Sequence, residues 1–444
     1  MADSKEILAQ LQKVLNSLKS LPYPHVANPA GCKKRASVAV IIRVRPAFEP
    51  TPKPNESLLE LDSGDAPAST IDDFFGRDWV QRGDAEVLFI KRAGRAGDRW
   101  SGHIALPGGK RDPEDDDDRA AAIRETREEV GLDLSAPDVL ETGSLPERIV
   151  ATTFGKVPLM VLCPYIFLYT SKTTPQPKPS PDEVASCHWV PLRALLSPQL
   201  RTHEYVDTAS RMAKQGGPVM QFVARCLVGK MMLSAVKLVP SESHFASSAP
   251  GFIPAEGQSA FTGLAEGAFG IPSSNQGLAH LQPLMLWGLT LGVLADFLDM
   301  LPPYNAVQLW DYPTFTPPDL RIFVWLFTRR MRRNNAHDMN TGTWPYNKEK
   351  PKTRRRASQT AMDATSYARA VTEGEPTSIN PKVAHETKGS DAISHPHDSI
   401  GRLLEGYYHN MNIAIVAFLM YRTALGSAIA YYGFKAWRKY QARL

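Results

Sequence analysis

The stretch LPGGKRDPEDDDDRAAAIRETREEVGL, residues 106–132, decides the fold of this 444-residue chain. It begins with a Gly-Gly turn, crosses an acidic loop and enters a run of Ala, Arg and Glu, which are strong helix formers. Gly131 ends that run, because glycine readily adopts the left-handed conformation that closes helices. The stretch therefore predicts a helix from Arg119 to Val130 between two loops.

Three glutamates of this predicted helix, Glu125, Glu128 and Glu129, lie at positions i, i+3 and i+4 and share one face. Carboxylates gathered in so small a volume repel each other unless a cation lies between them. Oxygen ligands select a hard ion, so we expect Mg²⁺, or Mn²⁺ in its place. Arg124 is placed to pair with a carboxylate and hold its rotamer.

The residues before the helix are candidates for contacts with a metal ion or a phosphate. Gly108 and Gly109 let the backbone approach such a group without an intervening Cβ, so we place Gly109 at the metal and Gly108 at the substrate. Lys110 and Arg111 follow, where cations would hold diphosphate oxygens. The alternative for both is an ordinary surface position.

Gly109 and the run from Arg124 to Leu132 resemble the Nudix box, GX5EX7REUXEEXGU, in which U is aliphatic. The sequence departs from that box in three ways. Asp115 stands in place of the first Glu, the spacer from it to Arg124 is one residue longer, and Thr126 replaces an aliphatic residue.

The surrounding sequence is similar to the coenzyme A diphosphatase branch of that family. The similar segments are residues 88–92, 100–105, 106–113, 182–184, 189–192 and 286–290. One extra residue separates Arg92 from Gly102, and His103 stands where glutamine is usual. We take Arg92 and His103 as substrate contacts, with a polar rim position as the alternative for His103.

The resemblance covers about residues 37 to 300 and implies an α+β fold, the Nudix α/β/α sandwich with a mixed sheet. It further implies Mg²⁺-dependent hydrolysis of a nucleoside diphosphate derivative, with coenzyme A or acyl-coenzyme A preferred. Arg124 and either Glu128 or Glu183 would carry the catalysis, although Glu183 could equally be an exposed loop carboxylate. Two alternatives stay open: a catalytically weak Nudix-fold binding protein, and a hydrolase of NADH, ADP-ribose or capped RNA.

Periodicity and composition divide the chain into four parts. These are an N-terminal amphipathic helix (residues 4–20) with a linker, 1–36; the hydrolase domain, 37–302, with insertions near 47–82 and 240–282; a basic, largely disordered linker, 303–405; and a candidate transmembrane helix with a basic tail, 406–444. Within the domain we expect strands over residues 37–46, 86–92, 157–169 and 185–190, and a closing helix over 283–301.

The formal net charge of +5 is small for this length, which argues against nucleic acid as a partner. The basic runs 329–333 and 350–356 could still attract nucleic acid, import factors or anionic lipid, with a solvated linker as the alternative. Four widely spaced cysteines and the lack of an N-terminal apolar region predict an intracellular protein with reduced thiols.

The C-terminal stretch Ile413 to Phe434 is mostly apolar and, at 22 residues, long enough to span a bilayer. Basic and aromatic residues follow it, so we predict a tail anchor on a mitochondrial or peroxisomal membrane. Arg422 opposes insertion by about 2.5 to 3.5 kcal/mol. A homodimer paired along small residues such as Ala424 and Ala428 would shield that charge. The alternative is an amphipathic helix lying on a membrane or docked on the protein itself.

Overall fold

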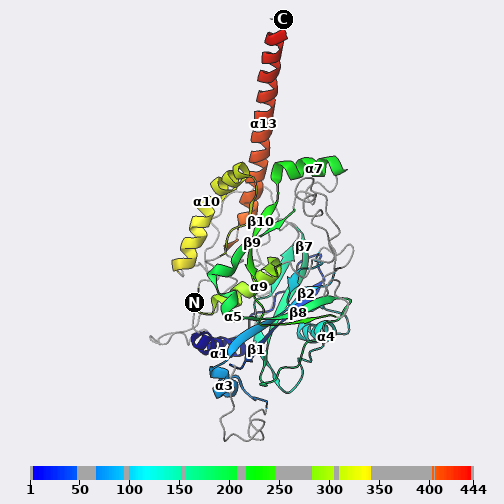
Figure 1. Ribbon diagram of the computed structural model, residues 1–444, viewed down its shortest axis with the longest axis vertical. Coiled ribbons are helices and arrows are strands. Elements are labelled where there is room, and N and C mark those ends of the chain that lie inside the picture. Colours follow the sequence, from blue (N-terminus) through cyan, green and yellow to red (C-terminus); the bar gives the residue numbers. More distant parts are fainter. Residues whose placement is uncertain are drawn as a thin grey trace, which may run out of the picture.

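The computed structural model describes residues 4–47, 67–94, 100–151, 157–207, 217–246, 283–304, 310–341, 403–404 and 406–441. Within these ranges the chain forms a mixed sheet with helices on both faces, a smaller second sheet and a long C-terminal helix (Figure 1). The predicted α+β architecture with a mixed sheet is confirmed.

The larger sheet has the strand order β11-β8-β2-β1-β7-β5, and β3, β4 and β6 pair with β2, β1 and β7. Its strands are β1 (Arg35–Arg45), β2 (Asp84–Arg92), β3 (Ile104–Ala105), β4 (Gly108–Lys110), β5 (Val139–Ser144), β6 (Arg148–Ala151), β7 (Pro158–Tyr169), β8 (Val184–Pro191) and β11 (Glu242–Phe245). β1 runs parallel to β7 and antiparallel to β2, which makes the sheet mixed.

β1 is buried on both faces because its apolar residues do not alternate with polar ones. Val40 and Ile42 belong to one hydrophobic cluster, whereas Ala39 and Ile41 belong to another. Successive side chains of a strand point to opposite faces, so β1 needs a covering layer on each side.

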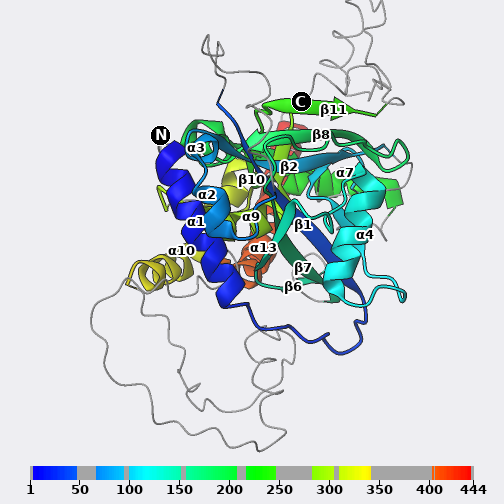
Figure 2. The ribbon, with the colours of Figure 1, turned by 90° about the horizontal axis from the view of Figure 1, so that it is seen from below.

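Helices supply these two layers (Figure 2). The first face is covered by α1 (Ser4–Ser20), α2 (Ile71–Phe75), α3 (Asp78–Gln81), α5 (Leu192–Leu195) and α9 (Gly288–Asp299). The second face is covered by α4 (Asp118–Val130), whose Val130 packs with Ile41. The predicted N-terminal helix is α1, and its six buried apolar residues make it part of the core.

The smaller sheet has the order β12-β10-β13, with β9 also paired to β10. Its strands are β9 (Arg201–Val206), β10 (Met231–Lys237), β12 (Met285–Trp287) and β13 (Thr314–Phe315). A short 3-10 helix, η2 (Pro198–Leu200), precedes β9, and α7 (Gly217–Val228) leads into β10. β12 also contacts β3, so the two sheets meet near the end of β2.

Four predicted segments differ from the structure. The insertion expected near 240–282 contains β11, which pairs with β8 in the larger sheet, and residues 285–287 of the closing helix expected over 283–301 form β12. The surface excursion expected near 47–82 contains α2 and α3, and Ile71, Phe74 and Val80 are buried in the core. The linker expected over 303–405 contains β13 and α10 (Pro318–Thr341), so its disorder was wrongly predicted for that part. Residues 48–66, 247–282 and 342–402, with the basic run 350–356, lie outside the described residues.

The C-terminal helix α13 (Tyr407–Gln441) has two different halves. Tyr407, Met411, Ala414, Ile415 and Phe418 are buried in a third cluster with residues of α7, β10, β13 and α10. The remainder projects away from the body (Figure 1). Among the described residues, α13 is the one helix long and apolar enough to cross a membrane, judged by length and composition only, and 17% of its most apolar window is buried.

Candidate active site

α4 is fixed at both ends by local hydrogen bonds. The side chain of Asp117 accepts a hydrogen bond from the Ala120 N–H at 2.7 Å, which caps the first turn. Gly131 adopts the left-handed conformation, with φ of 69°, and donates its N–H to the Arg127 carbonyl at 3.0 Å. The predicted glycine stop is therefore confirmed.

β4 lies between β1 and α4, and its first two positions, 108 and 109, leave no space for a Cβ atom. Gly108 has φ of 143°, and a Cβ at this position would lie 2.2 Å from the carbonyl oxygen of Ser37 in β1. A Cβ on Gly109 would lie 2.3 to 2.5 Å from the carboxylate of Glu125. The Gly-Gly backbone is thus in direct contact with the acidic face of α4.

Glu129 is the most deeply placed carboxylate of this face, with 2% of its surface exposed. Its Oε2 accepts a hydrogen bond from the Gly108 N–H at 2.9 Å. Burial raises the pKa of Glu129 to about 7; the Gly108 bond and Arg92 oppose the shift, and the charges of Glu125 and Glu183 add to it. Burial likewise raises the pKa of Glu125, against the effect of its neighbour Arg124.

The loop before β8 brings Glu183 to this group. The Ser180 N–H donates to the Glu129 carbonyl at 2.8 Å, and the Ala93 N–H donates to the Glu183 carbonyl at 2.8 Å. The loop is therefore tied both to the end of α4 and to the chain after β2. The charge of Glu183 contributes to the raised pKa of both Glu125 and Glu129, so Glu183 belongs to the acidic group.

Arg124 is held by Asp115 in a two-pronged ion pair, with Nε to Oδ1 at 2.9 Å and Nη2 to Oδ2 at 3.0 Å. The hydrogen bond from Arg124 lowers the pKa of Asp115. Asp115, which replaces the first Glu of the box, thus fixes the arginine. Arg124 also lies 3.1 Å from Glu125 and 3.0 Å from Glu128, whose side chain is 56% exposed and turned toward it.

The predicted substrate contacts separate into two groups. Nη1 of Arg92 lies 3.9 Å from Oε1 of Glu129, so Arg92 borders the acidic group. Lys110 is exposed on β4. Arg111 is turned away, because its Nη2 donates to the carbonyl oxygens of Asp115 at 3.3 Å and Asp116 at 2.9 Å. The structure thus does not bring Arg111 to the glutamates.

The ring of His103, the residue just before β3, lies near the rings of two tryptophans. Its ring centroid is 4.7 Å from that of Trp287 and 5.8 Å from that of Trp100. The Arg92 N–H donates to the His103 carbonyl at 3.0 Å, so the main chain at His103 is tied to Arg92, whose side chain borders the acidic group. Trp287 was expected only as an apolar residue of the closing helix; its signal as a site residue was its position in the segment 286–290.

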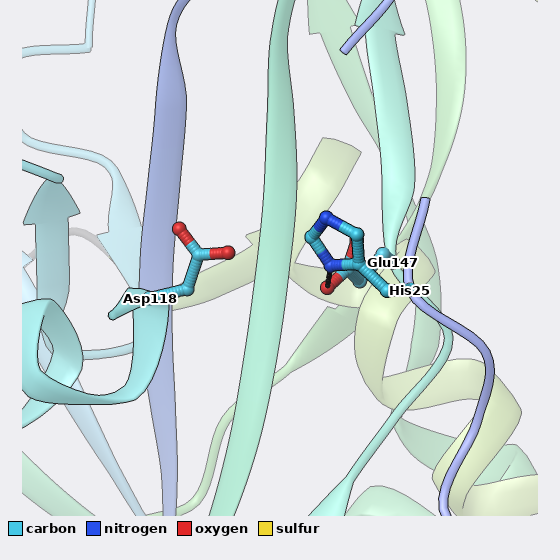
Figure 3. Close-up of side chains that lie close together, drawn as sticks. All are labelled: His25, Asp118 and Glu147. Atoms are coloured by element: carbon cyan, nitrogen blue, oxygen red, sulfur yellow. Dashed lines mark hydrogen bonds and ion pairs between the residues drawn. The ribbon is translucent and has the colours of Figure 1, made fainter. Parts of the chain in front are cut away.

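The set His25, Asp118 and Glu147 is the one group of three possible metal ligands within 4.8 Å of one another in the described part of the chain (Figure 3). The predicted glutamates do not form so compact a set. Arg35 already supplies a cation to this group, with Nε 2.7 Å from Asp118 and Nη2 2.8 Å from Glu147. The cluster is therefore an ion-pair network that joins the chain before β1 to α4.

The acidic group on α4 has the donor set that a hard divalent ion requires. Glu125, Glu129 and Glu183 offer carboxylate oxygens, and the charge of Glu183 helps to raise the pKa of Glu125 and of Glu129. Mg²⁺ usually keeps several waters and takes few carboxylates directly, so widely spaced ligands suit it. The residues present fit such an ion.

Fold and site together place the acidic face of α4 against the two glycines of strand β4. The NUDIX domain family matches residues 79–208, which include every glutamate of this group. The chain belongs to the Nudix hydrolase family.

Three relatives show how far the similarity extends. An uncharacterized protein of Schizosaccharomyces pombe is 30% identical over 262 residues, which are 59% of this chain and 70% of that protein. A peroxisomal coenzyme A diphosphatase of Mus musculus is 31% identical over 29% of this chain and 50% of its own length. A mitochondrial coenzyme A diphosphatase of Homo sapiens is 47% identical over 12% of this chain and 22% of its own length. The chain thus spans half or less of the two diphosphatases.

The two glycines of β4 should respond differently to substitution by alanine. In Gly109→Ala the new methyl group meets the mobile end of Glu125, so the melting temperature should stay near that of the wild type while kcat falls at least tenfold. In Gly108→Ala it meets the backbone of β1 at a positive φ, so stability should fall by about 1 to 3 kcal/mol or more. Thermal unfolding and steady-state kinetics of both variants check this contrast, and equal loss of stability in the two would contradict it.

Proposed function

We propose that this protein hydrolyses the diphosphate bond of a nucleoside diphosphate derivative, using Mg²⁺ or Mn²⁺, with coenzyme A or acyl-coenzyme A as the preferred substrate. The observation that carries the proposal is the burial of Glu129 beside Gly108, with Glu125 and Glu183 close enough to influence it. A buried group of this charge is costly unless a cation compensates it.

The chain's own residues divide the work of the reaction. When bound, the metal ion would neutralise phosphate charge and lower the pKa of a coordinated water. Glu125, Glu129 and the carbonyl of Gly109 would hold the ion, and Arg92 would bind a phosphate oxygen. Arg124 acts as a positioning residue, because Asp115 fixes it against Glu125 and Glu128.

Glu183 is the better of the two candidates for the general base. It lies with Glu125 and Glu129, whereas Glu128 is exposed and engaged by Arg124. In this proposal a Glu183 carboxylate oxygen takes a proton from the attacking water as the new phosphorus–oxygen bond forms. With coenzyme A and one water, the products are 3′,5′-ADP and phosphopantetheine.

Coenzyme A is proposed ahead of other diphosphates on sequence similarity. The segments around Leu106 to Pro113 resemble the coenzyme A branch, and two of the relatives carry that activity in their names. The rings of Trp100, His103 and Trp287 border the site beside Arg92, where they offer aromatic surface to a large substrate.

A hydrolysis screen over coenzyme A, acyl-coenzyme A, NADH, ADP-ribose and capped RNA tests the proposal. We expect the highest kcat/KM for coenzyme A or an acyl derivative, and Glu129→Gln should lower kcat by a factor of about 100 or more. Glu114→Gln, which alters an exposed loop carboxylate, is the matched control and should leave kcat unchanged. Preference for another diphosphate would reject coenzyme A, and tight binding without hydrolysis would indicate a binding protein.

Metal binding should depend on pH in a defined direction. Because the pKa of Glu129 is raised to about 7, this carboxyl is protonated in mildly acid solution and must lose its proton to bind a metal ion. The dissociation constant for Mg²⁺ should therefore fall as pH rises from about 6 to about 8, with protons released on binding only at the lower pH. Titration calorimetry in two buffers of different ionisation enthalpy measures both quantities, and a constant affinity over that range would contradict the expectation.

We also propose that the exposed half of α13 anchors the enzyme in a mitochondrial or peroxisomal membrane. α13 as a whole has the length and composition of a span. Two relatives of this chain are named as a peroxisomal and a mitochondrial enzyme. Trp437 and Tyr440 lie near the end of α13 with Arg438 and Lys439, as aromatic and basic residues do at membrane interfaces.

Removal of the exposed half alone should release the protein from membranes. A chain ending at Thr423 keeps Tyr407 to Phe418, which belong to the core, and so should retain its melting temperature. The full chain should remain in a carbonate-resistant membrane pellet, and the shortened chain should be soluble. A chain ending at Gln441 is the control, and extraction of the full chain by carbonate would refute the anchor.

A further inference from the structure

The first half of α10 lies beside the point where α13 leaves the body. Nε of Arg422 in α13 donates to Oδ2 of Asp319 in α10 at 2.8 Å. The ring of Phe323 is 5.5 Å from that of Tyr421 and 5.8 Å from that of Phe418. The two helices are therefore packed together up to Arg422, and α13 continues alone beyond it.

This contact changes where a membrane span must begin. Residues up to Phe418 are packed in the core, and nearly all of the chain from Met420 to Gln441 is exposed. Within that exposed part, Arg422 and Lys435 bound the run without charged residues. They are 13 positions apart, about 20 Å along a helix, compared with about 30 Å for the hydrocarbon core, so a span requires their long side chains to extend to the headgroups and the bilayer to thin. Arg422 then lies near the membrane surface, neutralised by Asp319, and no longer at the middle of the span.

Large apolar side chains are exposed around this same point. On α10, Ile322 is 63% exposed, Trp325 is 52% exposed and Leu326 is 48% exposed, at the i, i+3 and i+4 positions that share one helix face. Phe222 of α7, on the other side of α13 in Figure 1, is 67% exposed. Clustered exposure of this kind marks a surface that contacts another phase or partner.

The charges next to this face identify the partner as an anionic lipid surface. Arg329, Arg330 and Arg333 are exposed on the turns of α10 that follow Leu326. Exposed apolar side chains that are followed along the helix by arginines suit the headgroup boundary of a bilayer, where apolar groups enter the leaflet and arginines meet anionic headgroups. The apolar face also continues into the exposed half of α13, for which a membrane is already proposed.

We propose that the first half of α10 inserts Ile322, Trp325 and Leu326 into the leaflet that α13 enters, and that Arg329, Arg330 and Arg333 bind its anionic headgroups. The inference rests on the proposal that α13 spans a bilayer. It fixes the orientation of the body, because two helices then contact one membrane surface. α4 lies toward the end of the body away from the tip of α13 (Figure 1), so the candidate active site faces water.

The test places a polarity-sensitive fluorophore on the full chain at Leu326→Cys. Cys226→Ser removes the exposed thiol, and the three other cysteines are buried. Leu21→Cys, at a leucine that is 52% exposed after α1, is the matched control. Both proteins are reconstituted in vesicles of phosphatidylcholine with phosphatidylserine, and in vesicles of phosphatidylcholine alone.

The label at position 326 should shift its emission to shorter wavelength and be quenched by nitroxide-bearing lipids, more strongly with phosphatidylserine present. The label at position 21 should show neither effect. Replacing Arg329, Arg330 and Arg333 together by Gln should remove the dependence on phosphatidylserine, because these charges are gone and the apolar face remains.

Three other outcomes would each contradict a proposal, and they can be told apart. A carbonate-resistant protein whose label at position 326 reports water would overturn this inference and leave the anchor standing. A label shielded from water but not quenched by lipid-borne nitroxide would overturn it in favour of a second copy of the chain on this face. Extraction of the full chain by carbonate would remove the anchor itself, and the inference with it.

Discussion

The hydrogen bond from the Gly108 N–H to Glu129 is the contact on which the rest of the site depends. It ties a buried carboxylate of α4 to β4, which in turn pairs with the central strand β1. The bond forms only because Gly108 accepts a positive φ where β1 leaves no space for a Cβ. A second main-chain bond, from Ser180 to the Glu129 carbonyl, brings the Glu183 loop to the same place. The sheet, the helix and the loop therefore meet at one carboxylate, and burial keeps its pKa high.

Elements defined by local pattern could be predicted from the sequence. The N-terminal helix was expected over residues 4–20 and has those bounds, and α4 begins one residue earlier than expected. Periodicity, capping residues and a terminal glycine are all encoded within a few residues of each element. β13 could not be found in this way, because two residues carry no period and its partner β10 lies more than 80 positions earlier. The same lack of a local signal hid the packing of α10 against α13.

The candidate site, like the fold, combines features that local sequence predicts with features that depend on distant residues. The shared face of Glu125, Glu128 and Glu129 follows from helix geometry and needs no tertiary information. The orientation of Glu128 toward Arg124 does depend on tertiary structure, because Asp115, on the acidic loop before α4, sets the position of the guanidinium group. The contact between His103 and Trp287 joins residues 184 positions apart, one just before β3 and the other in β12 of the smaller sheet. Spacing along the chain cannot reveal such a pair, whereas the resemblance to a family could mark the segment without assigning the residue a role.

Arg422 shows why hydropathy alone could not divide the C-terminal stretch. Counted along the sequence, it is a charge inside an apolar run, and a partner helix was needed to shield it. The structure supplies Asp319 instead, from a segment 103 positions earlier, and so separates a packed half of α13 from an exposed half. The packed half shares its cluster with Phe315 of β13 and Met231 of β10. β10 pairs with β12, whose Trp287 contacts His103 beside the acidic group. A continuous series of packed elements thus runs from α13 to the rim of the candidate site. The described residues therefore form one packed unit from α4 to the packed half of α13, and the segment expected to be a disordered linker contributes α10 and β13 to that unit.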